Sequence, residues 1–148
     1  MCILTALPSY AQNAVHYYFK TMDIRNGLSQ NTVYQILQDR KGFMWFGTKD
    51  GLNRYDGLSY RVYKKENSGL GKNFITALYE DHEGNIWIGT DGGVFIYNPV
   101  LDSFTAFNQT SDKGTVIKDF VTMIGSDEYD NIWISVENQG LFCYNHEK

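Results

Sequence analysis

Aspartates are the side chains of this sequence best suited to chemistry, and three of them recur in one setting. Asp39, Asp81 and Asp127 each stand six residues before a tryptophan. Carboxylates act as general acids and bases when their surroundings set different pKa values. Catalysis normally needs an asymmetric constellation, however, and a carboxylate found once in every copy of a motif predicts a structural role.

Other reactive residue types form no recognisable site. The histidines share no ligand spacing and do not recur between copies of the motif; they are His16, His82 and His146. A metal site would need them to converge with carboxylates. Cys2 and Cys143 form no CxxC pair, and residues 47–51, GTKDG, lack the spacing and the strand-to-helix setting of a phosphate-binding loop. The sequence therefore predicts no catalytic residue, no metal site and no cofactor.

Composition narrows the class of protein. The chain has 148 residues, a formal net charge of −4 and 16% aromatic residues. Such an aromatic content disfavours disorder. Nucleic-acid binding needs a clustered positive face, whereas the strongest basic run, Lys64-Lys65, is followed at once by Glu66. There is no apolar run of about 18 residues, so no membrane span is predicted.

The aspartate–tryptophan motif belongs to a longer repeat. Its copies are DRKGFMWFGTKDGLNRYD at 39–56, DHEGNIWIGTDGGVFIYN at 81–98 and DEYDNIWISVENQGLFCYN at 127–145. Trp45, Trp87 and Trp133 are therefore 42 and 46 residues apart. Self-similarity at this period is typical of an array of supersecondary units.

Each copy predicts short antiparallel strands. In the run before the aspartate, Val33 and Ile36 are three residues apart, which could also indicate a helical turn. The counterparts at 74–80 and 120–126 are rich in β-formers and favour a strand. Asp-x-x-Gly predicts a type I turn, in which the aspartate caps backbone N–H groups. The third copy has Asp130 in place of the glycine, and aspartate tolerates the left-handed conformation better than most residues.

Four strands per repeat predict an all-β fold of β-propeller blades, with the tryptophans between blades. We expect an outer strand without a partner at about 15–22 and repeats at about 28–63, 70–107 and 116–145, the last lacking its final strand. Propellers usually have four to eight blades. The chain is therefore expected to be a piece of a longer propeller, or an open array that self-associates through exposed blade faces.

Residues 1–11, MCILTALPSYA, predict the remnant of a secretory signal peptide, since an apolar stretch leads to a small-residue pattern. The charged segment that normally begins such a signal is missing, which suggests a start codon placed too late or a clipped gene. The exported, periplasmic part would then be 12–148. The alternative is a frayed N-terminus of a cytosolic protein.

The stretch 27–57 and the second copy at 73–98 closely resemble the two-component regulator propeller repeat. The third copy departs from it at Asp130, at Ser135-Val136 and by one residue inserted before Gly140. The resemblance implies the periplasmic sensor region of a hybrid two-component regulator. Many such regions recognise oligosaccharides released from polysaccharides. Kinase activity would reside in modules that this chain does not contain.

A ligand is expected at the loops that open onto one face of the propeller near its axis. Their polar residues, which could hydrogen-bond a sugar while Tyr or Trp rings stack on it, are Arg25, Lys49, Asp50, Lys72, Asn73 and Asp91. The same residue types also occur in any solvated loop. The leading hypothesis is a non-enzymatic sensor segment with an oligosaccharide as ligand, and with further blades or a second copy as protein partner.

Two other functions stay open. A propeller enzyme of the quinone-dependent dehydrogenase or lyase type would need a unique charged cluster at the axis and a cofactor site. A purely structural or protein-interaction propeller is barely distinguishable from a sensor by sequence.

Overall fold

The computed structural model describes residues 17–108, 114 and 116–145, and these residues form strands and one short 3-10 helix, η1 (Ile24–Asn26). The strands are β1 (Val33–Gln38), β2 (Met44–Thr48), β3 (Gly51–Tyr55), β4 (Tyr60–Tyr63), β5 (Ile75–Glu80), β6 (Ile86–Thr90), β7 (Gly93–Asn98), β8 (Ser103–Ala106), β9 (Val121–Ser126), β10 (Ile132–Val136) and β11 (Gly140–Tyr144). No α-helix occurs in these ranges, which confirms the all-β class. The helical alternative for the segment around Val33 and Ile36 is excluded, because that segment is β1.

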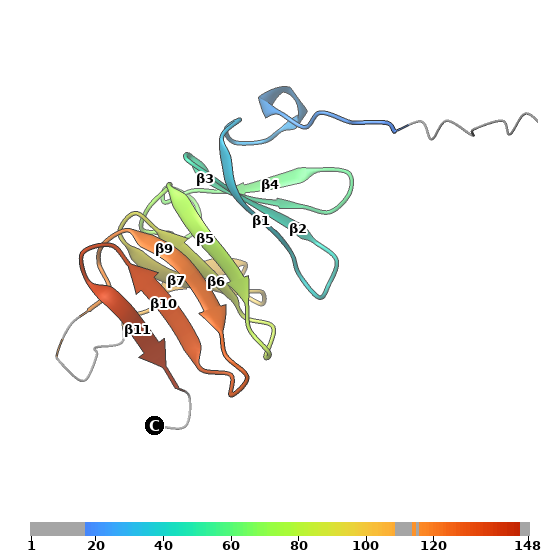
Figure 1. The fold of residues 1–148 in the computed structure, drawn as a ribbon. Helices are drawn as coiled ribbons and strands as arrows, with labels where there is room; N and C mark the ends of the chain where they lie inside the picture. Colours follow the sequence, from blue (N-terminus) through green and yellow to red (C-terminus); the bar gives the residue numbers. More distant parts are fainter. Residues whose placement is uncertain (1–16, 109–113, 115, 146–148) are drawn as a thin grey trace, which may run out of the picture.

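The strands form three antiparallel sheets, one from each repeat, which we call blades 1, 2 and 3. Their strand orders are β1-β2-β3-β4, β5-β6-β7-β8 and β11-β10-β9. Figure 1 shows the sheets following one another, and the first strand of blade 2, β5, contacts the first strands of both neighbouring blades, β1 and β9. The described residues thus form part of a propeller: the first two blades have four strands each and the last has three.

The strand expected at about 15–22 is not observed in the part that the structure describes. Residues 17–22 belong to no sheet and extend away from blade 1 (Figure 1), while residues 15 and 16 lie outside the described ranges. Tyr17, Tyr18 and Phe19 are 77–94% exposed. A strand is stable only when a neighbour takes up its backbone hydrogen bonds, and this segment has no such neighbour. The expected strand was one without a partner in this chain, so whether it forms in a longer propeller stays a prediction.

In each repeat the aspartate closes a turn and also anchors the tryptophan. The Gly84 N–H donates to the carbonyl of Asp81 at 3.0 Å, as in a type I turn. Oδ1 of Asp81 accepts from the backbone N–H groups of Glu83 and Asn85 at 3.0 and 2.8 Å, and Oδ2 accepts from Nε1 of Trp87 at 2.8 Å. The other two repeats form the same indole–carboxylate bond at 2.8 and 2.9 Å. The structural role expected for these aspartates is observed, together with an anchoring bond that the sequence did not predict.

The third repeat keeps this turn without its glycine. Gly42 and Gly84 have φ values of 90° and 87°, and Asp130 adopts 60° at the same position. The Asp130 N–H donates to the carbonyl of Asp127 at 3.2 Å, so the turn still closes. Aspartate therefore replaces glycine here, as expected.

Apolar cores lie between adjacent blades. Trp45 is fully buried between blades 1 and 2, with its ring 5.0 Å from that of Tyr97. Trp87 is 1% exposed between blades 2 and 3, with its ring 5.0 Å from that of Phe107. Trp133 is 38% exposed, because no described sheet covers the outer face of blade 3. The position expected between blades is therefore confirmed for two tryptophans and not reached by the third.

Candidate ligand-binding site

The loops expected to hold a ligand meet at one end of the blades, which we call the loop end. The β2–β3 turn contacts the connection that leads to β5, since the Gly51 N–H donates to the carbonyl of Asn73 at 2.7 Å. In blade 2 the equivalent turn donates from Asp91 to the carbonyl of Phe74 at 3.3 Å. The aspartate–tryptophan turns lie at the opposite end of the strands, because they connect β1 to β2 and β5 to β6.

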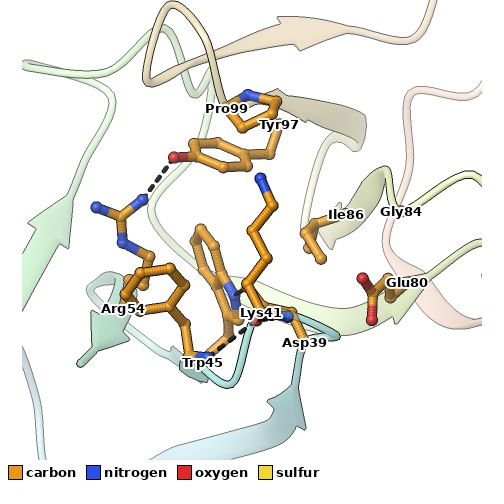
Figure 2. A pocket seen from close by; sticks show the side chains of 10 residues that line it. Asp39, Lys41, Trp45, Arg54, Glu80, Gly84, Ile86, Tyr97 and Pro99 are labelled. Carbon is orange, nitrogen blue, oxygen red and sulfur yellow. Dashed lines mark hydrogen bonds between the residues drawn. The ribbon is translucent and has the colours of Figure 1, made fainter. Parts of the chain in front are cut away.

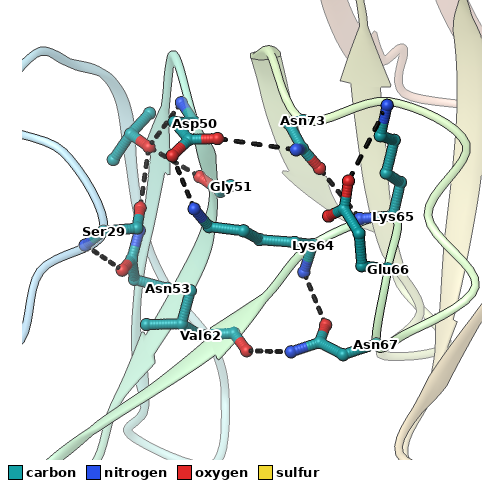
Figure 3. A network of polar contacts seen from close by, with 11 residues as sticks. Ser29, Asp50, Gly51, Asn53, Val62, Lys64, Lys65, Glu66, Asn67 and Asn73 are labelled. Carbon is teal, nitrogen blue, oxygen red and sulfur yellow. Dashed lines mark hydrogen bonds and ion pairs between the residues drawn. The ribbon is translucent and has the colours of Figure 1, made fainter.

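Asp50 and Asn73 are brought together at the loop end (Figure 3). Nζ of Lys64 lies 2.5 Å from Oδ2 of Asp50, and Nδ2 of Asn73 donates to Oδ1 of Asp50 at 3.5 Å. The side-chain oxygen of Asn73 accepts from the backbone N–H of Lys65 at 2.8 Å. Both side chains are thus engaged in holding the connection between blades 1 and 2. They position the loops rather than present free groups to a ligand.

Beside the β2–β3 turn, the network continues through Ser29, Thr48 and Asn53, which the sequence analysis did not name. The Ser29 and Thr48 hydroxyls lie 2.9 Å apart, and the side-chain oxygen of Asn53 accepts from the Ser29 backbone N–H at 2.8 Å. Thr48 and Asn53 are fully buried. These contacts join residues 19 and 24 positions apart, which explains why local sequence patterns did not reveal them.

Lys49, Lys72 and Asp91 remain available at the loop end. The aliphatic chain of Lys72 lies over Gly92, where an added Cβ would stand 2.5 Å from Cε of the lysine. Asp91 immediately precedes that glycine, and Lys49 occupies the corresponding turn of blade 1. Within the described part of the chain, none of these three side chains forms a hydrogen bond or an ion pair. They are the predicted residues that could donate to or accept from a ligand.

Arg25 lies apart from this group. Its Nε donates to Oδ2 of Asp23 at 2.9 Å, across the N-terminal cap of η1. These hydrogen bonds from the Arg25 side chain and backbone lower the pKa of Asp23 below its ordinary value. The adjacent Gly27 packs on the ring of Tyr60 in the outer strand β4. No described contact joins Arg25 to the loop end.

A row of aromatic rings crosses the three blades beside these loops. The Tyr34 and Phe74 ring centroids are 4.8 Å apart, and those of Phe74 and Phe120 are 5.5 Å apart at an interplanar angle of 86°. Tyr34 belongs to β1, whereas Phe74 and Phe120 immediately precede β5 and β9. Tyr34 is 46% exposed and the other two rings are partly exposed. We call these three residues the aromatic row.

Sequence comparison of the repeats could reveal only part of the aromatic row. Phe74 and Phe120 occupy equivalent positions, where blade 1 has Thr32, while Tyr34 stands two residues later. The pairing of β1 with β2 is irregular between Val33 and Gln35, and equivalent irregularities occur in β5 and β9. A β-bulge redirects the side chain of its extra residue. The bulge therefore explains how the side chain of Tyr34 reaches the Phe74 ring, a contact that the sequence position of Tyr34 would not predict.

A cavity of about 170 Å³ lies between blades 1 and 2 at the aspartate–tryptophan end (Figure 2). It is lined by Asp39, Lys41, Phe43, Trp45, Arg54, Glu80, Gly84, Ile86, Tyr97 and Pro99. Most of its charged groups already have protein partners: Asp39 binds the Trp45 indole, and Glu80 accepts from the backbone N–H of Arg40. The Arg54 guanidinium stacks 4.8 Å above the Phe43 ring. The cavity therefore offers few free groups to a ligand.

Arg54 also links the two blades through a shared carboxylate. It donates to the Tyr97 hydroxyl at 2.6 Å, and the Tyr97 and Tyr63 hydroxyls donate to Asp102 Oδ1 at 2.8 and 2.6 Å. Arg61 pairs with the other oxygen of Asp102. Burial opposes ionisation of Asp102, but hydrogen bonds from the tyrosines and the nearby guanidinium groups outweigh it and lower its pKa. Burial, and then the bond to Asp102, raise the pKa of Tyr63.

In the second and third repeats, the turn aspartates Asp81 and Asp127 accept hydrogen bonds that lower their pKa values. For Asp81, burial raises the pKa, but hydrogen bonds from Trp87 and Asn85 more than offset this and leave it below its ordinary value. For Asp127, hydrogen bonds from Asn131 and Trp133 lower the pKa to about 2. A group this acidic holds no proton at neutral pH, so neither aspartate is suited to act as a general acid.

Metal-binding clusters and membrane-spanning helices are both absent from the described residues. No group of three or more His, Cys, Asp or Glu side chains is placed to hold a metal ion among them. In the same residues, no helix is long and apolar enough to cross a membrane.

Comparison with known proteins gives matches in sequence and in fold. The two-component regulator propeller family matches residues 27–50 and 69–92. "Histidine kinase P4" of Formosa agariphila is 42% identical over 59 residues, which are 40% of this chain and 4% of that protein. The chain thus spans a small part of this relative.

Solved structures agree in fold. The extracellular domain of the putative hybrid two component system BT3049 from B. thetaiotaomicron has a TM-score of 0.75 and 29% identity, over 86% of this chain and 19% of that one. The corresponding domain of BT4673 from the same organism has a TM-score of 0.69 and 30% identity, over 79% and 17%. These similarities in fold agree with the match of residues 27–50 and 69–92, which cover parts of the first two repeats, to the two-component regulator propeller family.

Proposed function

We propose that this chain is a non-enzymatic, ligand-sensing segment of the periplasmic propeller of a hybrid two-component regulator, and that the ligand of the parent protein is an oligosaccharide. The observation that carries the proposal is the aromatic row, Tyr34, Phe74 and Phe120, beside turns with unpaired polar side chains. The extracellular domains of hybrid two-component systems with the same fold support an exported sensor.

The chemistry of the loop end suits a carbohydrate. One face of a sugar ring carries C–H groups, which pack on flat aromatic surfaces, while its hydroxyl groups donate and accept hydrogen bonds. Tyr34 would supply the ring face. Lys72 and Lys49 would donate to hydroxyl oxygens and Asp91 would accept from hydroxyl groups. Asp50 and Asn73 would keep the loops in place, and Arg25 takes no part in the proposed site.

An enzymatic role has no comparable support. The carboxylates of the turns are bound to indole and backbone N–H groups, and those of Asp50 and Asp102 are bound to cationic side chains. The polar groups left free in the described part of the loop end are spread over different blades. Binding is therefore the function that this geometry favours.

Isothermal titration calorimetry of the chain with a panel of neutral and acidic oligosaccharides tests the proposal. For an oligosaccharide that binds, Tyr34→Ala should weaken affinity about tenfold or more, equivalent to about 1.4 kcal/mol. Lys72→Ala should also weaken it. Tyr129→Ala is the matched control, because Tyr129 is an exposed tyrosine at the opposite end of the strands. The absence of binding across the panel, or unchanged affinity in both loop-end variants, would contradict the proposal.

A further inference from the structure

No described sheet covers the outer face of blade 3, whereas the equivalent faces of blades 1 and 2 are each buried by the next blade. Met123 and Leu141 on this face are 68% and 63% exposed, and Trp133 is 38% exposed. Trp45 and Trp87, the counterparts of Trp133, are buried by the blade that follows each of them. The interfaces between blades 1 and 2 and between blades 2 and 3 therefore show how a partner sheet would have to pack on blade 3.

Both internal interfaces depend on a glycine two residues after the tryptophan. A Cβ added at Gly47 would stand 2.8 Å from Cγ2 of Ile75, and one added at Gly89 would stand 2.7 Å from Cγ1 of Val121. Ile75 and Val121 are the first residues of β5 and β9, the innermost strands of the following blades. A β-branched side chain of the next blade thus fills the space that the missing Cβ leaves.

Blade 3 has no such space. Ser135 occupies the place of these glycines, since it follows Trp133 by two residues and pairs with Met123 as Gly89 pairs with Ala77. Its hydroxyl lies 2.9 Å from that of Thr122, which fixes the side chain on the blade. A sheet that approached as blade 2 approaches blade 1 would press a γ-carbon against the Ser135 Cβ.

We propose that Ser135 determines which sheet can pack on blade 3. A propeller sheet whose innermost strand begins with glycine or alanine has no γ-carbon at this position and can pack there. A second copy of this chain cannot, because its innermost strand begins with a β-branched residue. The copy is a relevant competitor because blade 1 presents the face that blades 2 and 3 use internally. Ile36 on that face is 64% exposed. The innermost strand of blade 1 begins with Val33, a β-branched residue like its counterparts in blades 2 and 3.

The proposal is tested by sedimentation equilibrium of the whole chain over a wide range of concentrations. A reducing buffer is needed because Cys143 is exposed. Ser135→Gly removes the Cβ that fills the space on blade 3. Val33→Ala removes the γ-carbons that blade 1 of a second copy would press against that Cβ. Each variant should self-associate head to tail at least about tenfold more tightly than the natural chain, with a mean mass rising above 17.0 kDa.

Ser135→Ala is the matched control, since it keeps the Cβ and removes only the hydroxyl; it should associate no more tightly than the natural chain. Trp133 fluorescence should become less sensitive to a soluble quencher as Ser135→Gly associates, which locates the contact on blade 3. Circular dichroism establishes that each variant is folded. The proposal is overturned if the folded Ser135→Gly and Val33→Ala variants both match the natural chain, or if Ser135→Ala associates as strongly as Ser135→Gly.

Discussion

Replacing Trp87 with alanine removes the largest side chain between blades 2 and 3. A tryptophan buries 150–250 Å², which at about 25 cal/mol per Å² corresponds to roughly 4–6 kcal/mol as an upper bound. Measured losses for tryptophan-to-alanine changes in cores are about 3–5 kcal/mol. Trp87 is 1% exposed, so we expect its loss to fall in that range.

Trp133→Ala provides an internal comparison. Both tryptophans donate to the aspartate six residues earlier, at 2.8 and 2.9 Å, so each variant loses the same hydrogen bond. Trp133 is 38% exposed and lacks a following blade, and we expect its replacement to cost about half as much, roughly 1.5–2.5 kcal/mol. The difference between the two variants measures packing against the next blade.

The assay is urea denaturation at neutral pH, followed by the β-sheet signal in circular dichroism so that the loss of a fluorophore does not matter. Free energies of unfolding come from linear extrapolation. Equal losses for the two variants, or a loss below about 1 kcal/mol for Trp87→Ala, would refute the assignment of Trp87 to an inter-blade core.

Further predictions concern the close approach of the blades and the acid sensitivity of the turns. Gly89→Ala should destabilise the chain by about 1–3 kcal/mol, because the added Cβ would overlap Val121. Gly125→Ala is the control and should be nearly neutral, because an added Cβ there meets nothing within 4 Å. Similar melting temperatures for the two variants would contradict this prediction. The pKa of Asp127 is about 2 in the folded chain against 3.8 without its partners, so its stabilising effect is present above pH 4 and is lost as the pH falls toward 2. Melting temperatures between pH 6 and pH 2.5 should therefore drop less for Asp127→Asn than for the natural chain, and parallel curves would show that this carboxylate is not responsible.

The turns and strands could be predicted from sequence because their interactions are local. The Asp81 carboxylate accepts from backbone N–H groups two and four residues away, so residue types at fixed spacing were sufficient to predict the turn. The bond from the Trp87 indole to the same carboxylate was seen only in the structure. The period of the repeat then predicted the sheets. Composition alone could not decide the structure at Tyr17, Tyr18 and Phe19, because strand formation there depends on a neighbouring strand that residue types do not specify.

The candidate site was predictable only as a region. Loop positions follow from the strand order, so Lys49, Lys72 and Asp91 could be named in advance. Whether a polar loop side chain is free or engaged depends on residues from other strands: Asp50 pairs with Lys64, 14 positions away, and this was decided by the tertiary structure.

Sequence by itself determined the repeat, its turns and its strands, because each rests on contacts within one supersecondary unit. Only the tertiary structure decided which faces are covered. Trp87 and Trp133 have the same local setting, yet one is buried and the other is partly exposed. The same holds for the aromatic row. Its role depends on side chains roughly one repeat away that meet because separate blades pack face to face.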